Sequence, residues 1–242
     1  MKRGLAAVAG LLTALGVSAQ LPKLDDLLKG AGIAPGASVG AADDKTNAAG
    51  IREALAVGTE RAVKNLAQVD GYFGNEAVKI LMPPNIRRVA DVARMAGFQR
   101  QVDEFTLSMN RAAEAAAPLA ARYFADAIRA MTLEDVRAIL TGGDTAATEF
   151  FRRKTHDTLY AAFKPVVSQK VGEVGATRAY KDMMGRYEKG MPLASNQTLD
   201  LDDFVTRKAL DGLFVMIGEE ERRIRSNPAA RTTELLKTVF GR

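Results

Sequence analysis

Apolar residues recur at helical spacing along most of the chain from Thr46 onward. In the first such stretch, steps of three, four and seven residues link Ile51, Leu55, Ala62, Val63 and Leu66. This spacing places side chains on one face of an α-helix and leaves most charged residues off that face. Similar stripes follow as far as Phe240. The sequence therefore predicts an all-α fold, a single bundle of about eight to ten helices.

Residues with strong turn or capping preferences separate the predicted helices. Turns are expected at Asp70-Gly71, Pro83-Pro84, Gly97 and Gly142-Gly143. The predicted N-caps are Thr132, in a capping box with Asp135, and Asp144, Asp200 and Asn227. We expect Pro165 to separate a helix that ends near Phe163 from a shorter helix that ends before Gly175.

Signals for β-strands are weak. No stretch combines period-two alternation with a hairpin dipeptide, and the one candidate strand pair lies around Tyr72–Met82. Two later segments, 177–187 and the stretch after Pro228, read as helices. In the second, Leu235, Leu236, Val239 and Phe240 are expected to point inward.

The N-terminus has the three parts of a secretory signal peptide. Lys2 and Arg3 precede an uncharged apolar stretch, 5–17, and the small residues Ser18 and Ala19 precede a predicted cleavage site. The alternative is a buried N-terminal helix. The predicted organisation is a signal peptide over 1–19, a flexible Gly- and Ala-rich arm over 20–46, and a helical domain over 47–242. No later stretch is long and uncharged enough to span a bilayer.

Composition narrows the chemistry by exclusion. The sequence contains no cysteine and a single histidine, His156, which rules out disulfides, thiolate metal sites and sites built on two imidazoles. Loss of Lys2 and Arg3 with the signal peptide would lower the formal charge from +5 to +3. So small a surplus argues against nucleic acid as a partner, since non-specific binding needs a clustered basic patch.

Six runs together resemble the bacterial family called domain of unknown function 4197. They are 70–73 (DGYF), 109–114 (MNRAAE), 131–135 (MTLED), 143–148 (GDTAAT), 208–214 (KALDGLF) and 219–233 (EEERRIRSNPAARTT). The likeness covers about 47–241. The resemblance implies an exported, helical protein of the Gram-negative cell envelope, here periplasmic, with no assigned activity. Some members of the family look like lipoproteins, and this chain departs from them because it lacks a cysteine to acylate.

The C-terminal run of charge allows two interpretations. Glu221 and Arg225 are four residues apart in the favourable order for a helical ion pair, and Glu219 and Arg223 share that register. One interpretation is a solvated helix face. In the other, Glu220 or Glu221 turns inward as a carboxylate ligand.

Polar residues also interrupt two apolar stretches. Asp211 lies within an apolar run, where a buried carboxylate needs a partner such as Arg111 or Arg231. Asn110 and Glu114 share a face of an alanine-rich helix. They are interpreted either as a structural hydrogen-bond network or as the lining of a ligand cleft.

Two further features carry little chemistry. The glycine pair before Asp144 could hold an anion at a helix N-terminus, but Asp144 would repel phosphate and the lysine of a P-loop is missing. His156 has no G-x-S-x-G elbow with which to form a hydrolase triad. The basic cluster around His156 is expected to face solvent or anionic lipid.

The favoured hypothesis is a non-enzymatic periplasmic protein that binds an envelope protein or a small ligand through a polar-lined groove, without cofactor or metal. The candidate binding residues are Asn110, Arg111, Glu114, Asp211, Glu221, Arg225 and Arg231. A first alternative is a hydrolase or metal-dependent enzyme in which Glu114, Asp211 and Glu221 converge. A second is peripheral lipid contact through the basic surface and the apolar turn Leu21–Leu28.

Overall fold

The computed structural model describes residues 44–173 and 200–227, and these residues are all helical or irregular. They lie in one compact unit that begins at Ala42. The elements in chain order are α2 (Asp44–Leu66), α3 (Pro84–Met95), α4 (Gln99–Ala116), the 3₁₀ turn η1 (Ala117–Leu119), α5 (Ala120–Arg129), α6 (Leu133–Thr141), α7 (Ala146–Glu173) and α9 (Leu201–Ser226). The predicted all-α class is confirmed.

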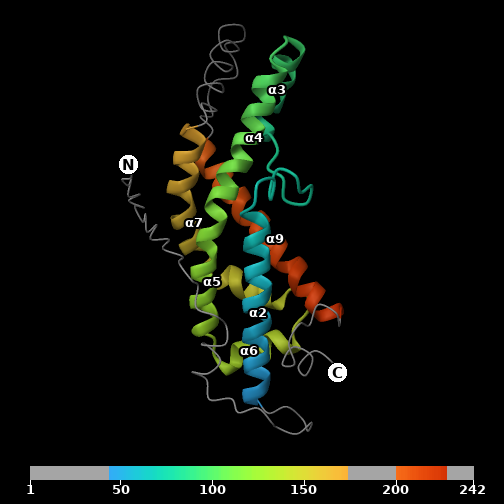
Figure 1. Ribbon diagram of the computed structural model, residues 1–242, viewed down its shortest axis with the longest axis vertical. Coiled ribbons are helices and arrows are strands. Elements are labelled where there is room, and N and C mark those ends of the chain that lie inside the picture. The colour runs from blue at the N-terminus through green and yellow to red at the C-terminus, as the bar shows by residue number, and fades with distance from the viewer. Residues whose placement is uncertain (1–43, 174–199, 228–242) are drawn as a thin grey trace, which may run out of the picture. The chain divides into compact units, whose positions relative to one another are not determined.

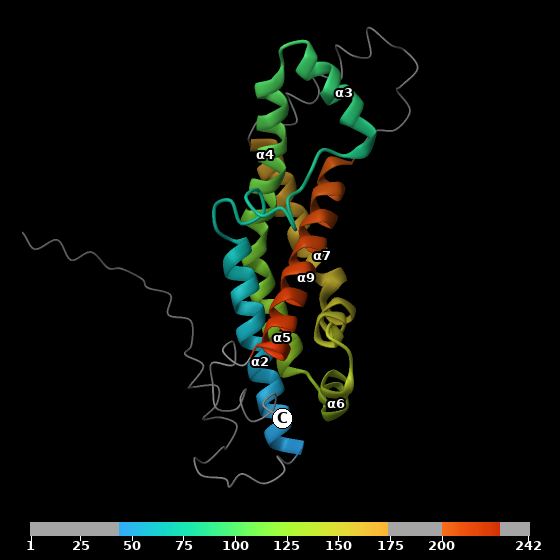
Figure 2. The ribbon, with the colours of Figure 1, turned by 90° about the vertical axis from the view of Figure 1, so that its right-hand side faces the viewer.

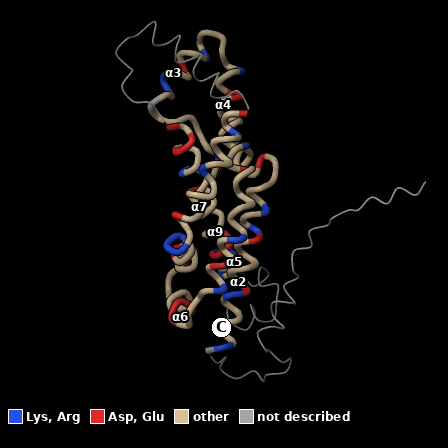
Figure 3. The backbone as a smooth tube through the Cα atoms, turned by 90° about the vertical axis from the view of Figure 1, so that its left-hand side faces the viewer, with Lys and Arg blue, Asp and Glu red and all other residues tan. Residues whose placement is uncertain are grey.

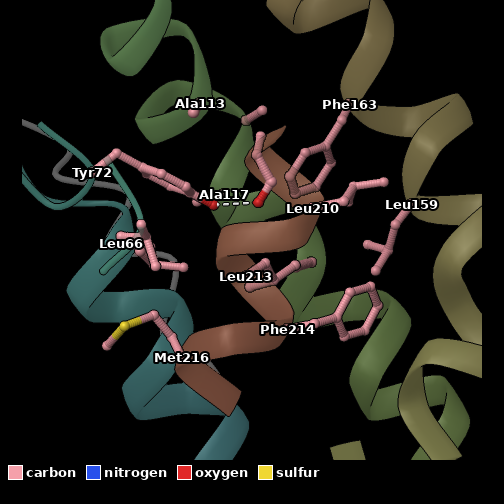
Figure 4. Packing of buried hydrophobic residues seen from close by; sticks show 14 of the residues in the cluster. Leu66, Tyr72, Ala113, Ala117, Leu159, Phe163, Leu210, Leu213, Phe214 and Met216 are labelled. Carbon is pink, nitrogen blue, oxygen red and sulfur yellow. Dashed lines mark hydrogen bonds between the residues drawn. The ribbon is translucent and has the colours of Figure 1, made fainter. Parts of the chain in front are cut away.

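Helix α9 lies at the centre of the packing. It runs beside α7, α2 and α4, while α5 packs on α2 and α7 (Figures 1 and 2). Phe124 of α5 meets Phe151 of α7 and Phe214 of α9 edge to face, with ring centroids 5.0 and 6.4 Å apart. Figure 4 shows Leu159, Phe163, Leu210 and Phe214 filling the space between α7 and α9.

The predicted helical stripes are buried in this core. All five members of the first stripe are buried: Ile51, Leu55, Ala62, Val63 and Leu66. In α9 the apolar run around Asp211 raised the possibility of a buried carboxylate. The structure buries Leu210 and leaves Asp211 exposed, as hydrophobic burial requires.

Several predicted helix ends are confirmed. Thr132 caps α6 in a capping box, in which its Oγ1 accepts from the Asp135 N–H at 3.1 Å and Asp135 Oδ2 accepts from the Thr132 N–H at 3.0 Å. The Asp200 side chain caps α9 by accepting from the Asp203 N–H at 2.9 Å. Gly97, which follows α3, has a φ of 89°, a conformation that favours glycine.

The described residues contain fewer helices than the sequence predicted for the domain. Seven α-helices and η1 lie in the described ranges 44–173 and 200–227, fewer than the predicted eight to ten. One reason is that Pro165 lies inside α7 instead of ending it. Burial of Leu159, Phe163, Val167 and Val171 on both sides of the proline keeps the helix packed. The predicted helices at 177–187 and after Pro228 lie outside the described residues.

The strand pair proposed around Tyr72–Met82 is wrong. Residues 67–83, called here the 67–83 loop, form turns and irregular structure. Their backbone N–H groups at Tyr72, Phe73 and Ile80 bond to side chains of α4, so they take no part in a β-ladder. Apolar side chains of the loop, Tyr72 and Ile80 among them, are buried in the common core.

Candidate functional site

The candidate polar residues fall into two separate groups and one exposed position. Asn110, Arg111 and Glu114 lie on α4, and Glu221 and Arg225 lie near the end of α9. Asp211 is exposed, and Arg231 lies outside the described residues. Figure 3 shows basic and acidic positions interspersed along the helices, without a large region of one sign in this view.

The first group, which we call the loop junction, is built on the carboxylate of Glu114. Its Oε1 accepts from the N–H groups of Tyr72 and Phe73 at 3.1 and 3.2 Å. Its Oε2 accepts from Arg111 Nη1 at 2.6 Å. Arg111 Nη2 also donates to Asp70 Oδ1 at 2.7 Å. Glu114 is buried, and these bonds satisfy a charge that would otherwise be costly in the interior.

Asn110 fastens the other end of the 67–83 loop to α4. Its Oδ1 accepts from the Ile80 N–H at 2.8 Å, and its Nδ2 donates to the Ile80 carbonyl at 2.9 Å. The same Nδ2 donates to the Thr106 carbonyl at 2.8 Å. Both donors of the amide are therefore used by backbone groups, as a structural network requires.

Tyr72 joins the loop junction to α9. Its hydroxyl donates to the Ala209 carbonyl at 2.7 Å, and Figure 4 shows the ring pointing from the loop into the core. Burial raises the pKa of Tyr72, and the charge of Glu114 raises it further. Close contact here depends on Gly212, because a Cβ at that position would lie 2.8 Å from Tyr72 Cε1.

The second group, which we call the α7 junction, is built on the carboxylate of Glu221. Its Oε1 accepts from the Ala147 N–H at 2.9 Å, and its Oε2 accepts from the N–H and Oγ1 of Thr148 at 2.8 Å each. Ala147 and Thr148 are the second and third residues of α7. Glu221 therefore does from α9 what an N-cap side chain does locally.

This geometry corrects the predicted N-cap at Asp144. Helix α7 begins two residues after Asp144, which is exposed, and the amides that an N-cap would bind are bonded to Glu221. A carboxylate from a distant helix also gains from the partial positive charge at the start of α7.

Arg225 extends the α7 junction to α6. Its Nε and Nη2 donate to Glu221 Oε1 at 3.1 and 2.9 Å, and Nη2 also donates to the Ile139 carbonyl at 2.9 Å. The ion pair expected from the spacing of Glu221 and Arg225 is confirmed. Arg223, however, pairs with Glu220 at 2.8 Å and not with Glu219. Since Glu220 and Glu221 are both buried, the solvated-face interpretation is wrong for these two residues.

Asp211 belongs to neither junction. Its carboxylate lies 3.2 Å from Lys208 Nζ and 4.0 Å from Arg152 Nη1, on the exposed side of α9. Arg111, one of its two predicted partners, is bonded to Glu114 and Asp70 instead. Glu114, Asp211 and Glu221 are thus held by different neighbours. Among the described residues, no group of three or more acidic or histidine side chains could hold a metal ion.

His156 lies on α7, and its side chain is half-exposed. Its Nδ1 is 2.9 Å from Asp157 Oδ1, and its ring stacks 6.5 Å from that of Phe214. Arg152 lies over the same phenyl ring at 4.6 Å. The basic side chains of Arg152, Arg153 and Lys154 are exposed, as the sequence predicted.

A small apolar groove, called here the α2–α9 groove, opens beside the α7 junction. It encloses about 30 Å³, room for one or two water molecules. Its lining comes from α2, α6, α7 and α9: Ile51, Ala54, Leu55, Gly58, Thr59, Ile139, Ala147, Phe151, Ile217, Glu221, Ile224 and Arg225. Two of the candidate residues, Glu221 and Arg225, thus form part of its wall.

A second hollow lies between α6 and α7. It measures about 290 Å³ and is lined by both apolar and polar residues, with Asp135, Glu149 and Arg153 as its charged members. It contains none of the candidate residues. Asp135 is already engaged in the capping box of α6, and Glu149 and Arg153 are exposed to solvent, which screens their charges.

Sequence reasoning missed Asp70, Tyr72 and the two amides that Glu221 binds. The signal for them was present in the runs that resemble a family. Runs 70–73, 109–114 and 208–214 meet at the loop junction, and runs 143–148 and 219–233 contribute the α7 junction. The groove residue Gly58 was also missed, although a glycine inside an otherwise regular helix is a detectable signal.

Fold and site together define a class: an all-α protein in which buried carboxylates join separate segments of the chain. Over residues 41–241 the chain matches the family described as Protein of unknown function (DUF4197). The chain belongs to that family. No curated protein and no solved structure matches it. In the part of the chain that the structure describes, no helix is long and apolar enough to cross a membrane.

Proposed function

We propose that this protein is a non-enzymatic binding protein of the cell envelope that contacts a polypeptide partner through the α2–α9 groove. The observation that carries the proposal is that the polar candidates are already bonded to other parts of the chain. Glu114 and Asn110 use their polar atoms on backbone groups and Arg111, and Glu221 uses both oxygens on α7 and Arg225. Carboxylates so engaged are poorly placed for acid–base or metal chemistry, which disfavours the enzyme alternative.

The size of the groove favours the side chains of a polypeptide over a free small molecule. Pockets for small ligands enclose roughly 300–1,000 Å³, and the α2–α9 groove encloses about 30 Å³. An apolar wall with one ion pair at its edge suits the tip of an apolar side chain from a polypeptide whose backbone lies near Arg225.

Gly58 gives a direct way to test the groove. A Cβ at this position would contact Ile224 Cδ1 at 3.5 Å and Glu220 Cβ at 3.7 Å, which are ordinary contacts. The flexible side chain of Gly58→Met would therefore fill the groove while the ion pair stays in place. Gly172→Met is the matched control, because Gly172 also lies in a helix and has no neighbour within 4 Å of its Cβ position.

The experiment uses a photo-reactive amino acid at Arg222, an exposed position next to Glu221, in Gram-negative cells. The expected result is one defined cross-linked polypeptide that also binds the purified chain. The cross-link should disappear in Gly58→Met and persist in Gly172→Met. Retention of binding in Gly58→Met, with unchanged thermal unfolding, would reject the groove. If Gly58→Met unfolds, the smaller Gly58→Ala is measured in its place.

Export is a separate part of the proposal and has its own test. The predicted signal peptide over 1–19 supports a periplasmic location. Fractionation should recover the mature chain in the periplasm with Gln20 as its first residue. Recovery of an uncleaved chain in the cytoplasm would reject export and leave the groove experiment unaffected.

A further inference from the structure

Helix α3 and the start of α4 form a hairpin at one end of the described helices (Figures 1 and 2). The inward face of α3 is apolar and buried, with Ile86, Val89, Ala90 and Ala93. Helix α3 packs mainly against α4. Its opposite face is therefore free of the main helical core.

That opposite face carries large apolar side chains in the open. Met95 is 81% exposed and Val92 is 47% exposed, and Leu81, just before α3, is 57% exposed. Arg88, Val92 and Met95 follow one another at steps of four and three, so they share a side of the helix. Val92 and Met95 therefore form an exposed apolar pair beside the charge of Arg88.

In the hairpin every acidic side chain pairs with an arginine, but not every arginine has an acidic partner in the described part of the chain. Asp91 lies 3.0 Å from Arg94, Asp103 lies 3.9 Å from Arg94, and Glu104 lies 3.7 Å from Arg100. These are all the acidic residues between Pro84 and Glu104. Arg87 and Arg88 are exposed and have no ion-pair partner among the described residues. The outer face therefore presents unmatched positive charge beside exposed apolar groups.

We propose that this face of α3 binds an anionic phospholipid surface. Guanidinium groups pair with phosphate oxygens in two-pronged geometry, and isolated apolar side chains such as Met95 can enter the headgroup region one at a time. The face is the exposed side of a helix, and its unmatched positive charge is complementary to acidic headgroups. This surface and its ligand are distinct from the α2–α9 groove and its polypeptide.

The test is flotation of the purified full chain with vesicles of phosphatidylcholine alone or with about a third of phosphatidylglycerol. Each basic residue near an anionic surface contributes about fivefold to partitioning at low salt. The double variant Arg87→Gln, Arg88→Gln should thus lose about 25-fold of its binding to anionic vesicles. Met95→Ser should lower binding more modestly. The segment 5–17 is present in every variant, so the differences report the hairpin.

The matched control is Arg153→Gln, Lys154→Gln, which removes the same charge from an exposed face of α7. It should keep the binding of the unmodified chain, and so should Gly58→Met. Equal losses in the two charge variants would show a general effect of net charge and overturn the proposal. It would also be overturned by the absence of anion-dependent flotation, or by a protein partner that requires Arg87 and Arg88 without vesicle binding. A failed groove experiment leaves this result unchanged.

Discussion

At the scale of single residues, two of the buried glutamates, Glu114 and Glu221, have the same task in different places. Glu114 accepts from two successive amides of the 67–83 loop, and Glu221 accepts from two successive amides at the start of α7. Arg111, three residues before Glu114, and Arg225, four residues after Glu221, balance these two charges. Hydrogen bonds and an ion pair of this kind offset the cost of burying the carboxylates of Glu114 and Glu221.

The first prediction concerns Glu114. Glu114→Ala leaves the amides of Tyr72 and Phe73 without their acceptor, and an unsatisfied buried group costs roughly 1–3 kcal/mol. We expect the free energy of unfolding to fall by about 3 kcal/mol, as measured by urea denaturation. Glu114→Gln keeps an acceptor oxygen and should cost about half as much.

The matched comparison is Asp211→Ala, because Asp211 is an exposed carboxylate with only surface ion pairs. Pairs of this kind contribute roughly 0–1 kcal/mol, so this variant should stay close to the unmodified chain. A Glu114→Ala protein as stable as Asp211→Ala would show that the loop junction does not hold the loop.

At the scale of elements, the start of each helix shows what local sequence can specify. Helices α6 and α9 begin with caps from their own neighbouring residues, Thr132 and Asp200, and both were predicted. Helix α7 takes its cap from Glu221, more than 70 residues away in the chain. A cap supplied over that distance leaves no local pattern, so Asp144 was the natural but wrong choice.

The second prediction concerns the α6 cap. Thr132→Ala removes the acceptor for the Asp135 N–H and should lower the free energy of unfolding by about 1 kcal/mol. The hydrogen bond from the Thr132 backbone holds the pKa of Asp135 below its ordinary value of 3.8. Because the folded-state pKa is the lower one, this stabilisation is complete above the unfolded pKa and is lost as the pH falls through the folded value.

The variant Asp135→Asn removes the charge of the side chain but keeps an oxygen that can accept a hydrogen bond. The difference in unfolding free energy between this variant and the unmodified chain should be constant above about pH 5. It should shrink as the pH falls below the ordinary carboxyl pKa. Urea denaturation at several pH values measures the difference, and a gap that grows on acidification would contradict the assignment.

At the scale of the whole chain, the sequence predicted class and local geometry better than long-range contacts. Helical stripes, the capping box and the Glu221–Arg225 pair were accessible because each depends on residues a few positions apart. The partners of Glu114 and Arg111 were not accessible, since Tyr72 and Asp70 lie about 40 residues away. The predicted helix end at Pro165 is wrong because burial of side chains on both sides of the proline outweighs its tendency to break helices.

At this scale the six runs that resemble the family have a structural role. Five of the six runs contribute atoms to one of the two junctions, and the remaining run, 131–135, forms the α6 cap. Their residues thus fix how the helices and the 67–83 loop are joined. Recognition of a partner is then left to surfaces beside the junctions, such as the α2–α9 groove.

Hydrogen exchange of single backbone amides tests this account most directly. In Glu114→Ala the amides of Tyr72 and Phe73 should lose protection while those of Ala147 and Thr148 keep it. In Glu221→Ala the pattern should be reversed, because each carboxylate serves its own pair of amides. Unchanged protection of all four amides in both variants, together with loss of partner binding, would contradict the structural role and assign these glutamates to a binding site.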